Sequence, residues 1–102
     1  MSSVLIVNEI ETEREEMTRA LEAEGFTVVQ AASGQDAVRQ IWNGPCLVAI
    51  VSTLLSGTPI APLRAQLVQM APDMEVLTHG QHDELPALVR KVVGIRDGES
   101  AA

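Results

Sequence analysis

The sequence predicts an α/β fold in which a doubly wound parallel sheet carries helices on both of its faces. Three observations predict this fold. Four short apolar runs are each followed by a segment with helical spacing of its apolar residues, so strands and helices alternate along the chain. The first and third of these runs, residues 4–7 and 47–51, are apolar throughout, which is typical of strands buried on both faces. The chain has 102 residues, the length of one domain, and the connections between its elements are short.

Two strand–helix pairs occupy the first part of the chain. Residues 4–7 form the first strand, and the helix over residues 11–24 ends at Gly25, a residue type that favours the turn at a helix C-terminus. Residues 26–31 form the second strand, and Ser33 caps the helix that follows. The capping box and apolar stripe of this second helix consist of Asp36, Ala37, Val38, Ile41 and Trp42.

A third pair follows in the same way. Residues 47–51 form the third strand, and Thr58 and Pro59 are the cap and first residue of a helix. Apolar positions on this helix, together with Met17 on the first one, are expected in the core. The apolar positions of the third helix are Ile60, Leu63, Leu67 and Met70.

The last pair comprises a strand over residues 75–78 and a helix that Gly94 ends. Its apolar stripe consists of Leu85, Leu88, Val89, Val92 and Val93. We therefore expect one domain over residues 1–95 and a flexible tail over residues 96–102.

Composition excludes several classes of function. The formal charge is -7, which argues against nucleic-acid and anionic-membrane partners because both bind clustered cations. Cys46 is the single cysteine, so we expect a core residue in a reducing cytoplasm rather than a disulfide or a multi-cysteine metal site. His79 and His82 alone are too few ligands to hold zinc. No signal peptide or membrane span is visible, and no metal or cofactor is expected.

Segments around the expected strand ends match a known pattern. The matching residues are 4–9, 19–26, 31–37 and 76–78. Over residues 3–78 the chain resembles the receiver domain of bacterial two-component response regulators. The resemblance implies a flavodoxin-like strand order. It also implies a site in which an acidic pair holds Mg²⁺ and an aspartate takes a phosphoryl group from a histidine kinase, beside a Thr or Ser and a Lys.

The chain departs from that pattern at the site itself. Asn8 stands where the first acid is expected, and Glu9 keeps a carboxylate at the second position. Val51 stands where the phosphorylated aspartate is expected, and Thr78 is retained. The only lysine, Lys91, lies inside the last helix. Because valine has no nucleophile, we expect a non-phosphorylatable pseudo-receiver that is not an enzyme and has no catalytic residue.

The resemblance also implies a shortened chain. Response regulator receivers have a further helix and a fifth strand before the final helix, whereas residues 79–85 alone link the two elements here. We expect four strands in the order 2-1-3-4, with the fourth at the edge. The last helix looks more like the family's final helix than its fourth, and both assignments stay open. The alternative to a pseudo-receiver is an atypical phosphoacceptor that uses Ser52, if the strand register slips by one, or Thr78.

A signalling or regulatory protein is the expected partner, and two surfaces are candidates for binding it. The outer face of the first helix is acidic, because residues 9–24 carry a net charge of -5, and it includes Glu11, Glu15 and Arg19. The second surface is the uncovered edge of the last strand with the flank of the last helix, where a homodimer is expected. Its residues are Val76, Leu85, Val89 and Val92. The chain as a dimerisation domain or fragment of a larger regulator is a further alternative.

Overall fold

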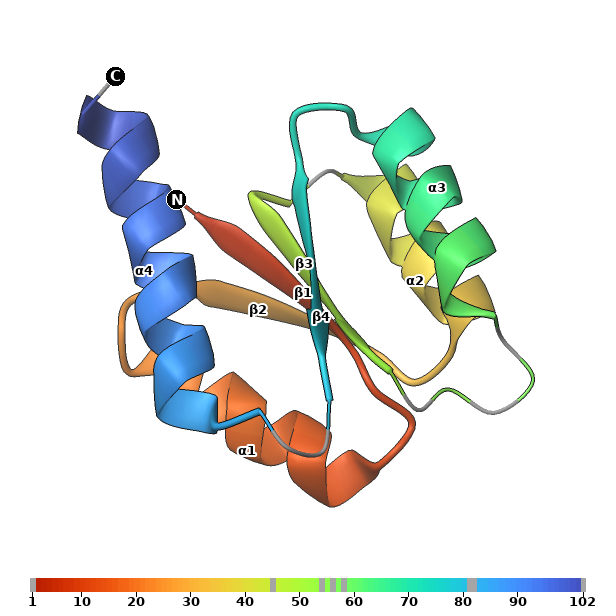
Figure 1. Cartoon of the computed structure of the whole chain (residues 1–102), viewed down its shortest axis with the longest axis horizontal. Helices are drawn as coiled ribbons and strands as arrows, with labels where there is room; N and C mark the ends of the chain where they lie inside the picture. The colour runs from red at the N-terminus through yellow and green to blue at the C-terminus, as the bar shows by residue number, and fades with distance from the viewer. Residues whose placement is uncertain are drawn as a thin grey trace.

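The computed structural model describes residues 2–44, 46–53, 55, 57, 59–80 and 83–101, with side chains through residue 98. Four parallel strands form one sheet, in the order β2-β1-β3-β4 (Figure 1). The elements are, in chain order, β1 (Ser3–Val7), α1 (Glu11–Glu22), β2 (Thr27–Ala31), α2 (Gly34–Asn43), β3 (Val48–Ser52), α3 (Ile60–Met70), β4 (Glu75–His79) and α4 (Leu85–Ala101). The predicted fold class and strand order are confirmed.

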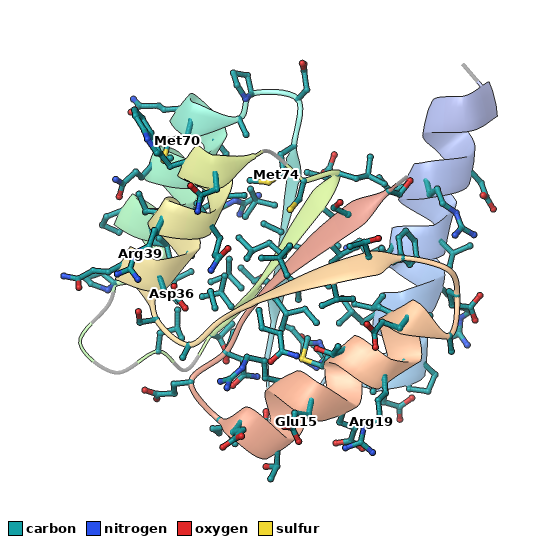
Figure 2. All side chains as sticks on the ribbon, turned by 180° about the vertical axis from the view of Figure 1, so that it is seen from behind. Glu15, Arg19, Asp36, Arg39, Met70 and Met74 are labelled. Carbon is teal, nitrogen blue, oxygen red and sulfur yellow. The ribbon has the colours of Figure 1, made fainter. Side chains whose placement is uncertain are left out.

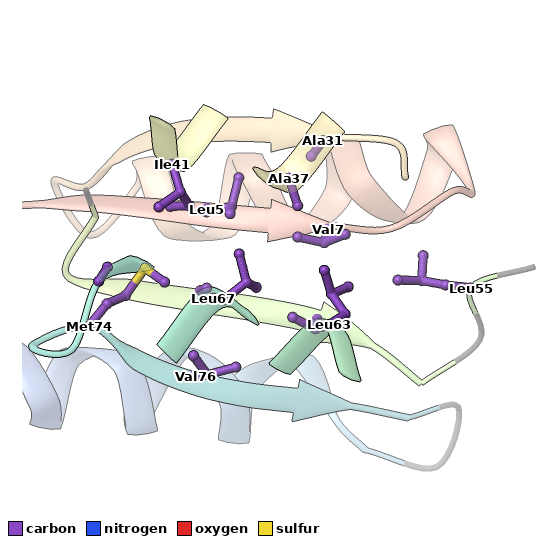
Figure 3. Close-up of a cluster of buried hydrophobic side chains, with 13 residues drawn as sticks. Leu5, Val7, Ala31, Ala37, Ile41, Leu55, Leu63, Leu67, Met74 and Val76 are labelled. Atoms are coloured by element: carbon purple, nitrogen blue, oxygen red, sulfur yellow. The ribbon is translucent and has the colours of Figure 1, made fainter. Parts of the chain in front are cut away.

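Each face of the sheet is covered by two helices, which is why the two central strands, β1 and β3, are apolar along most of their length. Successive side chains of β1 point to opposite faces. Leu5 belongs to a buried cluster beneath α2 and α3, whereas Ile6 belongs to one beneath α1 and α4. Figure 3 shows the first cluster, with Ile41 of α2 and Leu67 of α3 on the face of the sheet. None of the helices in the described parts of the chain is long and apolar enough to cross a membrane.

The position of α4 decides which helix of a receiver it corresponds to. After β2 the chain crosses over β1 to β3 and then continues to β4, and right-handed crossovers in this direction put α2 and α3 on one face. A helix leading on to a further strand beyond β4 would lie on that same face. Instead α4 packs on the opposite face, beside α1 (Figure 1). It is therefore a terminal helix rather than a crossover helix, in agreement with the preferred assignment.

The predicted boundary signals of the first helices are largely confirmed. Gly25 has a φ of 92°, a conformation that favours glycine. Helix α1 ends at Glu22, two residues earlier than expected, and β2 begins at Thr27, one residue later than expected. At the start of α2 the backbone N–H of Asp36 donates to Ser33 Oγ at 3.1 Å. The Asp36 carboxylate accepts from the N–H of Ala32 at 3.3 Å, one residue before the cap, so the Ser33 half of the predicted capping box is present and the return bond comes from the preceding residue.

The prediction that Trp42 belongs to the core is wrong. Its side chain is 82% exposed, because Ala37 and Ile41 take the positions of α2 that face the sheet. Trp42 lies about 100° further around the helix than Ile41, near the end of α2. The predicted cap Thr58 lies outside the described residues, and Pro59 is the residue that precedes α3.

The prediction that Gly94 ends the last helix is also wrong, whereas the flexible tail over residues 96–102 stays a prediction. A glycine inside a helix costs only about 1 kcal/mol relative to alanine, and α4 continues to Ala101. Arg96 ties this extension to the domain. Its guanidinium lies 4.7 Å from the centre of the Phe26 ring and donates to the carbonyl of Glu24 at 2.7 Å.

Candidate functional site

The carboxyl ends of three neighbouring strands meet at one edge of the sheet, where a ligand site of such folds is expected. Val7 of β1 pairs with Val51 of β3, which pairs in turn with Thr78 of β4. Asn8 follows β1 directly. The structure thus brings together the strand-end residues that the sequence indicated, in the arrangement that parallel strands impose.

Val51 is a core residue. Its side chain is 0% exposed and belongs to the same buried cluster as Leu55 and Leu63, beneath α3. Because side chains alternate along a strand, the next residue, Ser52, faces the side of the sheet covered by α1 and α4, and it is half-buried. Val51 has no nucleophilic atom, and the hydroxyl of Ser52 lies on the opposite face of the sheet from Val51.

Asn8 is buried, with 2% exposure, and its side-chain amide is bound locally. Asn8 Oδ1 accepts from the N–H of Ile10 at 2.9 Å, which shapes the turn into α1. Asn8 Nδ2 donates to Glu13 Oε1 at 3.4 Å and to Met17 Sδ at 3.9 Å. An aspartate could accept the first of these bonds but could donate neither of the others, so the amide has a structural role here.

Arg14 joins the start of α1 to the first two strands. Its Nη1 donates to the carbonyl oxygen of Asn8 at 2.8 Å, and its Nε donates to Gln30 Oε1 at 3.0 Å. Both bonds hold the guanidinium against the protein. The cation nearest to Asn8 among the described residues is therefore engaged in fixing the orientation of α1.

Three carboxylates line a cavity of about 400 Å³ between the first turns of α1 and α4. They belong to Glu13, Glu16 and Asp83, and His79 lies beside them. No Lys or Arg is among the residues described around this cavity. The lining is negative, which disfavours an anionic phosphate donor.

Thr78 and Lys91 both line a smaller cavity of about 220 Å³ along β4 and α4. Thr78 is exposed at the edge of the sheet. The lysine thus approaches the retained threonine from the last helix, which sequence reasoning did not foresee. Val51 contributes no acceptor to the pair, because its side chain is a hydrocarbon, and that side chain is buried under α3.

No group of three or more His, Cys, Asp or Glu side chains is arranged to hold a metal ion within the described residues. Glu9 is exposed, and His79 is half-buried. The pairing of His79 with His82 cannot be followed, since His82 lies outside the described residues. Cys46 is half-buried beside the core at the opposite end of the sheet, where burial raises the pKa of its thiol. A protonated thiol is a poor nucleophile, in keeping with a packing role.

The expected partner surface on α1 is exposed. Glu11, Glu15 and Arg19 all point to solvent, and Figure 2 shows Glu15 and Arg19 on the outer side of the helix. The Arg19 guanidinium lies 3.9 Å from the Glu15 carboxylate, an exposed pair that contributes little to stability.

The second expected surface differs from the prediction. Val76 is 6% exposed and Val92 is 0% exposed, because α3 and α4 cover the two faces of the sheet as far as β4. Neither residue lies on an uncovered flank. Leu85 and Val89 are half-buried and line a groove of about 390 Å³ that faces α1 rather than the edge of β4.

Sequence reasoning missed Glu13 and Asp83. Both lie in runs that read as solvated helix starts, and only the conformation of the turns brings them to one cavity. A signal was present for Asp83 alone. It lies two residues before α4, where its carboxylate accepts from the N–H of Gly80 at 2.7 Å.

No protein-family model matches the chain, and no curated protein sequence matches it. Its structure does match solved structures. A CheY-like receiver domain protein from Methanospirillum hungatei JF-1 aligns with a TM-score of 0.87 at 16% identity, over 100% of this chain and 99% of that one. A receiver domain protein from Clostridium thermocellum aligns with a TM-score of 0.85 at 12% identity, over 99% and 98%.

A third match is the response regulator protein TrrA from Thermotoga maritima, solved in complex with Mg²⁺ and BeF. It aligns with a TM-score of 0.82 at 16% identity, over 93% of this chain and 99% of that one. The resemblance seen in residues 3–78 therefore extends to the three-dimensional structure, helix α4 included. The chain has the flavodoxin-like fold of response regulator receiver domains.

Proposed function

We propose that the protein is a non-phosphorylatable pseudo-receiver, a protein–protein interaction module in bacterial signal transduction located in the cytoplasm. The observation that carries this proposal is the burial of Val51. A receiver scaffold that buries valine at the acceptor position has no group there to form an acyl phosphate bond.

The surroundings of the strand ends support the same proposal. Asn8 gives its amide to the turn and to Glu13, so it does not supply the first carboxylate of a Mg²⁺ site. The nearby cavity is lined by carboxylates without a described lysine or arginine to neutralise a transferred phosphoryl group. A scaffold that retains the receiver fold without these groups retains the surfaces through which such domains can bind proteins.

Incubation with acetyl phosphate and Mg²⁺ tests this proposal directly. We expect the intact mass of the protein to stay unchanged, because valine offers no nucleophile at the acceptor position. A phosphorylatable receiver treated in parallel is the control. A stable phosphoryl adduct on this chain contradicts the proposal.

The alternative, an atypical acceptor, makes a separate prediction within the same experiment. An adduct that disappears in Ser52→Ala or in Thr78→Ala would place the phosphoryl group at that hydroxyl. Thr78 is the better placed of the two, since it is exposed and shares a cavity with Lys91. Neither hydroxyl lies next to a described set of metal ligands.

Of the homodimer surface expected on β4 and α4, the edge of β4 is the part that supports the proposal. The N–H of Glu75 donates to Leu47 and the carbonyl of His79 accepts from Thr53, so odd-numbered residues of β4 face β3. The backbone groups of Val76 and Thr78 then point away from the sheet, as an edge available to a second strand.

The variant Thr78→Pro tests this edge. Proline removes an outward N–H and so blocks strand addition while keeping the bonds between β3 and β4. We expect it to weaken a dimer by about tenfold or more, at roughly 1.4 kcal/mol per tenfold, in sedimentation equilibrium. Val89→Lys, in the groove that faces α1, is the control and should leave the dimer intact. A wild-type monomer at high concentration would contradict the arrangement.

A further inference from the structure

Trp42 is the most exposed large apolar side chain that the structure describes. It is the only tryptophan of the chain, and 82% of its side chain is accessible to water. Tryptophan is enriched at the centres of protein interfaces, where a single indole often dominates the binding energy. A large apolar side chain exposed near the end of a helix marks a site where another surface can bind and cover it.

A groove lies on the same side of the molecule. It has a volume of about 420 Å³ and runs between α2 and α3, which pack side by side (Figure 1). Its apolar lining includes Val38, Pro62 and Leu63, and its polar lining includes the neutral amides of Gln35 and Gln66. Val38 precedes Trp42 by four residues, so the two side chains are neighbours on the surface of α2. A protruding ring and a groove therefore stand next to one another.

Charge is nearly absent from this side. Residues 25–72 contain one acid, Asp36, and two arginines, Arg39 and Arg64, whereas residues 9–24 alone carry a net charge of -5. Figure 2 shows Asp36 and Arg39 together on α2, with their charged atoms 3.9 Å apart. Two copies of a chain with charge -7 repel one another at most approaches. They repel least where the face of α2 and α3 meets its own copy.

We infer that two copies of this chain associate through α2 and α3, with Trp42 of each copy entering the α2–α3 groove of the other. A two-fold axis requires a surface that is complementary to itself, and a ring beside a groove is such a surface. The groove volume lies within the range of roughly 300–1,000 Å³ found for ligand pockets, ample for an indole. Gln35 and Gln66 supply hydrogen bonds at the rim without placing like charges across the axis.

This contact is independent of the proposed pseudo-receiver function and of the β4 edge. The groove is lined by α2, α3 and the residues before α3, on the face of the sheet opposite α1 and α4. If the chain were phosphorylated by acetyl phosphate, the pseudo-receiver proposal would fail and the contact between α2 and α3 would be unaffected. If Trp42 did not enter a dimer, this contact would be absent and the argument from Val51 at the acceptor position would be unaffected.

The single tryptophan makes the contact observable without a label. We expect its fluorescence emission to shift to shorter wavelength, and its quenching by acrylamide to fall, as the full chain is concentrated from about 1 µM to 1 mM. Sedimentation equilibrium of Thr78→Pro, in which the β4 edge is blocked, should give a dimer over the same range. Trp42→Gln should raise the dissociation constant by about 30-fold, the fold-change of a 2 kcal/mol hot spot.

Two further variants keep the indole as a probe. Gln66→Glu, an isosteric change in the groove, should abolish the spectral shift because it adds a carboxylate to each copy at the axis. Val68→Lys is the matched control, an exposed residue of α3 outside the groove lining, and it should leave the shift unchanged. Thr78→Pro should also leave it unchanged. A monomer throughout the range, a dimer in which the indole stays accessible, or a shift that survives Gln66→Glu would each overturn the proposal.

Discussion

Replacing Val51 by aspartate, the residue that a receiver has at this position, is expected to destabilise the fold strongly rather than restore phosphorylation. The new carboxylate would lie at a position that is 0% exposed, in a cluster of apolar side chains. An unpaired charge buried in this way costs roughly 3–5 kcal/mol. The total stability of a domain this size is roughly 5–15 kcal/mol. Urea denaturation followed by circular dichroism measures the loss.

A second variant, Val51→Thr, and the pH dependence of Val51→Asp separate the effect of charge from the effect of shape. Val51→Thr has nearly the same shape and adds a neutral hydroxyl, so its cost should be about 1–3 kcal/mol. Burial should raise the pKa of the Asp side chain above its usual value near 4. A carboxyl with a raised pKa in the folded state loses stability as the pH rises, so Val51→Asp should be least destabilised below about pH 4. If Val51→Asp folded with undiminished stability and accepted a phosphoryl group, the site would be a receiver site one substitution away from activity.

The fold could be predicted because its determinants are local and repeated. Apolar runs such as residues 4–7 indicate strands covered on both faces, and the resemblance to receiver domains implies their order. The errors arose where the extent of the sheet decides burial. Helical spacing put Trp42 on an apolar stripe, yet the sheet-facing positions belong to Ala37 and Ile41. The spacing of apolar residues in the sequence does not tell where the sheet beneath a helix ends.

The candidate site divides in the same way. That Val51 and Thr78 are neighbours follows from parallel pairing, which places successive strand ends at one edge. The partnership of Asn8 with Glu13 depends on the turn between β1 and α1, and nothing in the spacing of the two residues indicates it. Arg96 could not be foreseen as a packing residue either. Its contacts with Phe26 and Glu24 join segments that are far apart in the sequence, 72 residues in the case of the Glu24 hydrogen bond.

Asn8→Asp is the second substitution for which we expect a large effect. It would restore the first acid of the receiver pair, but at a position that is 2% exposed and 3.4 Å from the carboxylate of Glu13. Two carboxylates in contact repel, and the donor to Met17 Sδ is lost as well. We expect a loss of roughly 2–3 kcal/mol in the free energy of unfolding at pH 7.

The partner residue supplies the decisive comparison. Glu13→Gln alone should change stability by less than roughly 0.5 kcal/mol, because Glu13 lies on the exposed face of α1 and an amide oxygen still accepts from Asn8. Combined with Asn8→Asp, it turns the repulsion into a hydrogen bond with the polarity reversed, so a coupling of about 1–2 kcal/mol is expected in the double-mutant cycle. Repeating the cycle with Mg²⁺ distinguishes the two roles of this position. A structural amide predicts the same cycle with and without the ion, whereas selective stabilisation of Asn8→Asp by Mg²⁺ would identify Asn8 as a lost metal ligand.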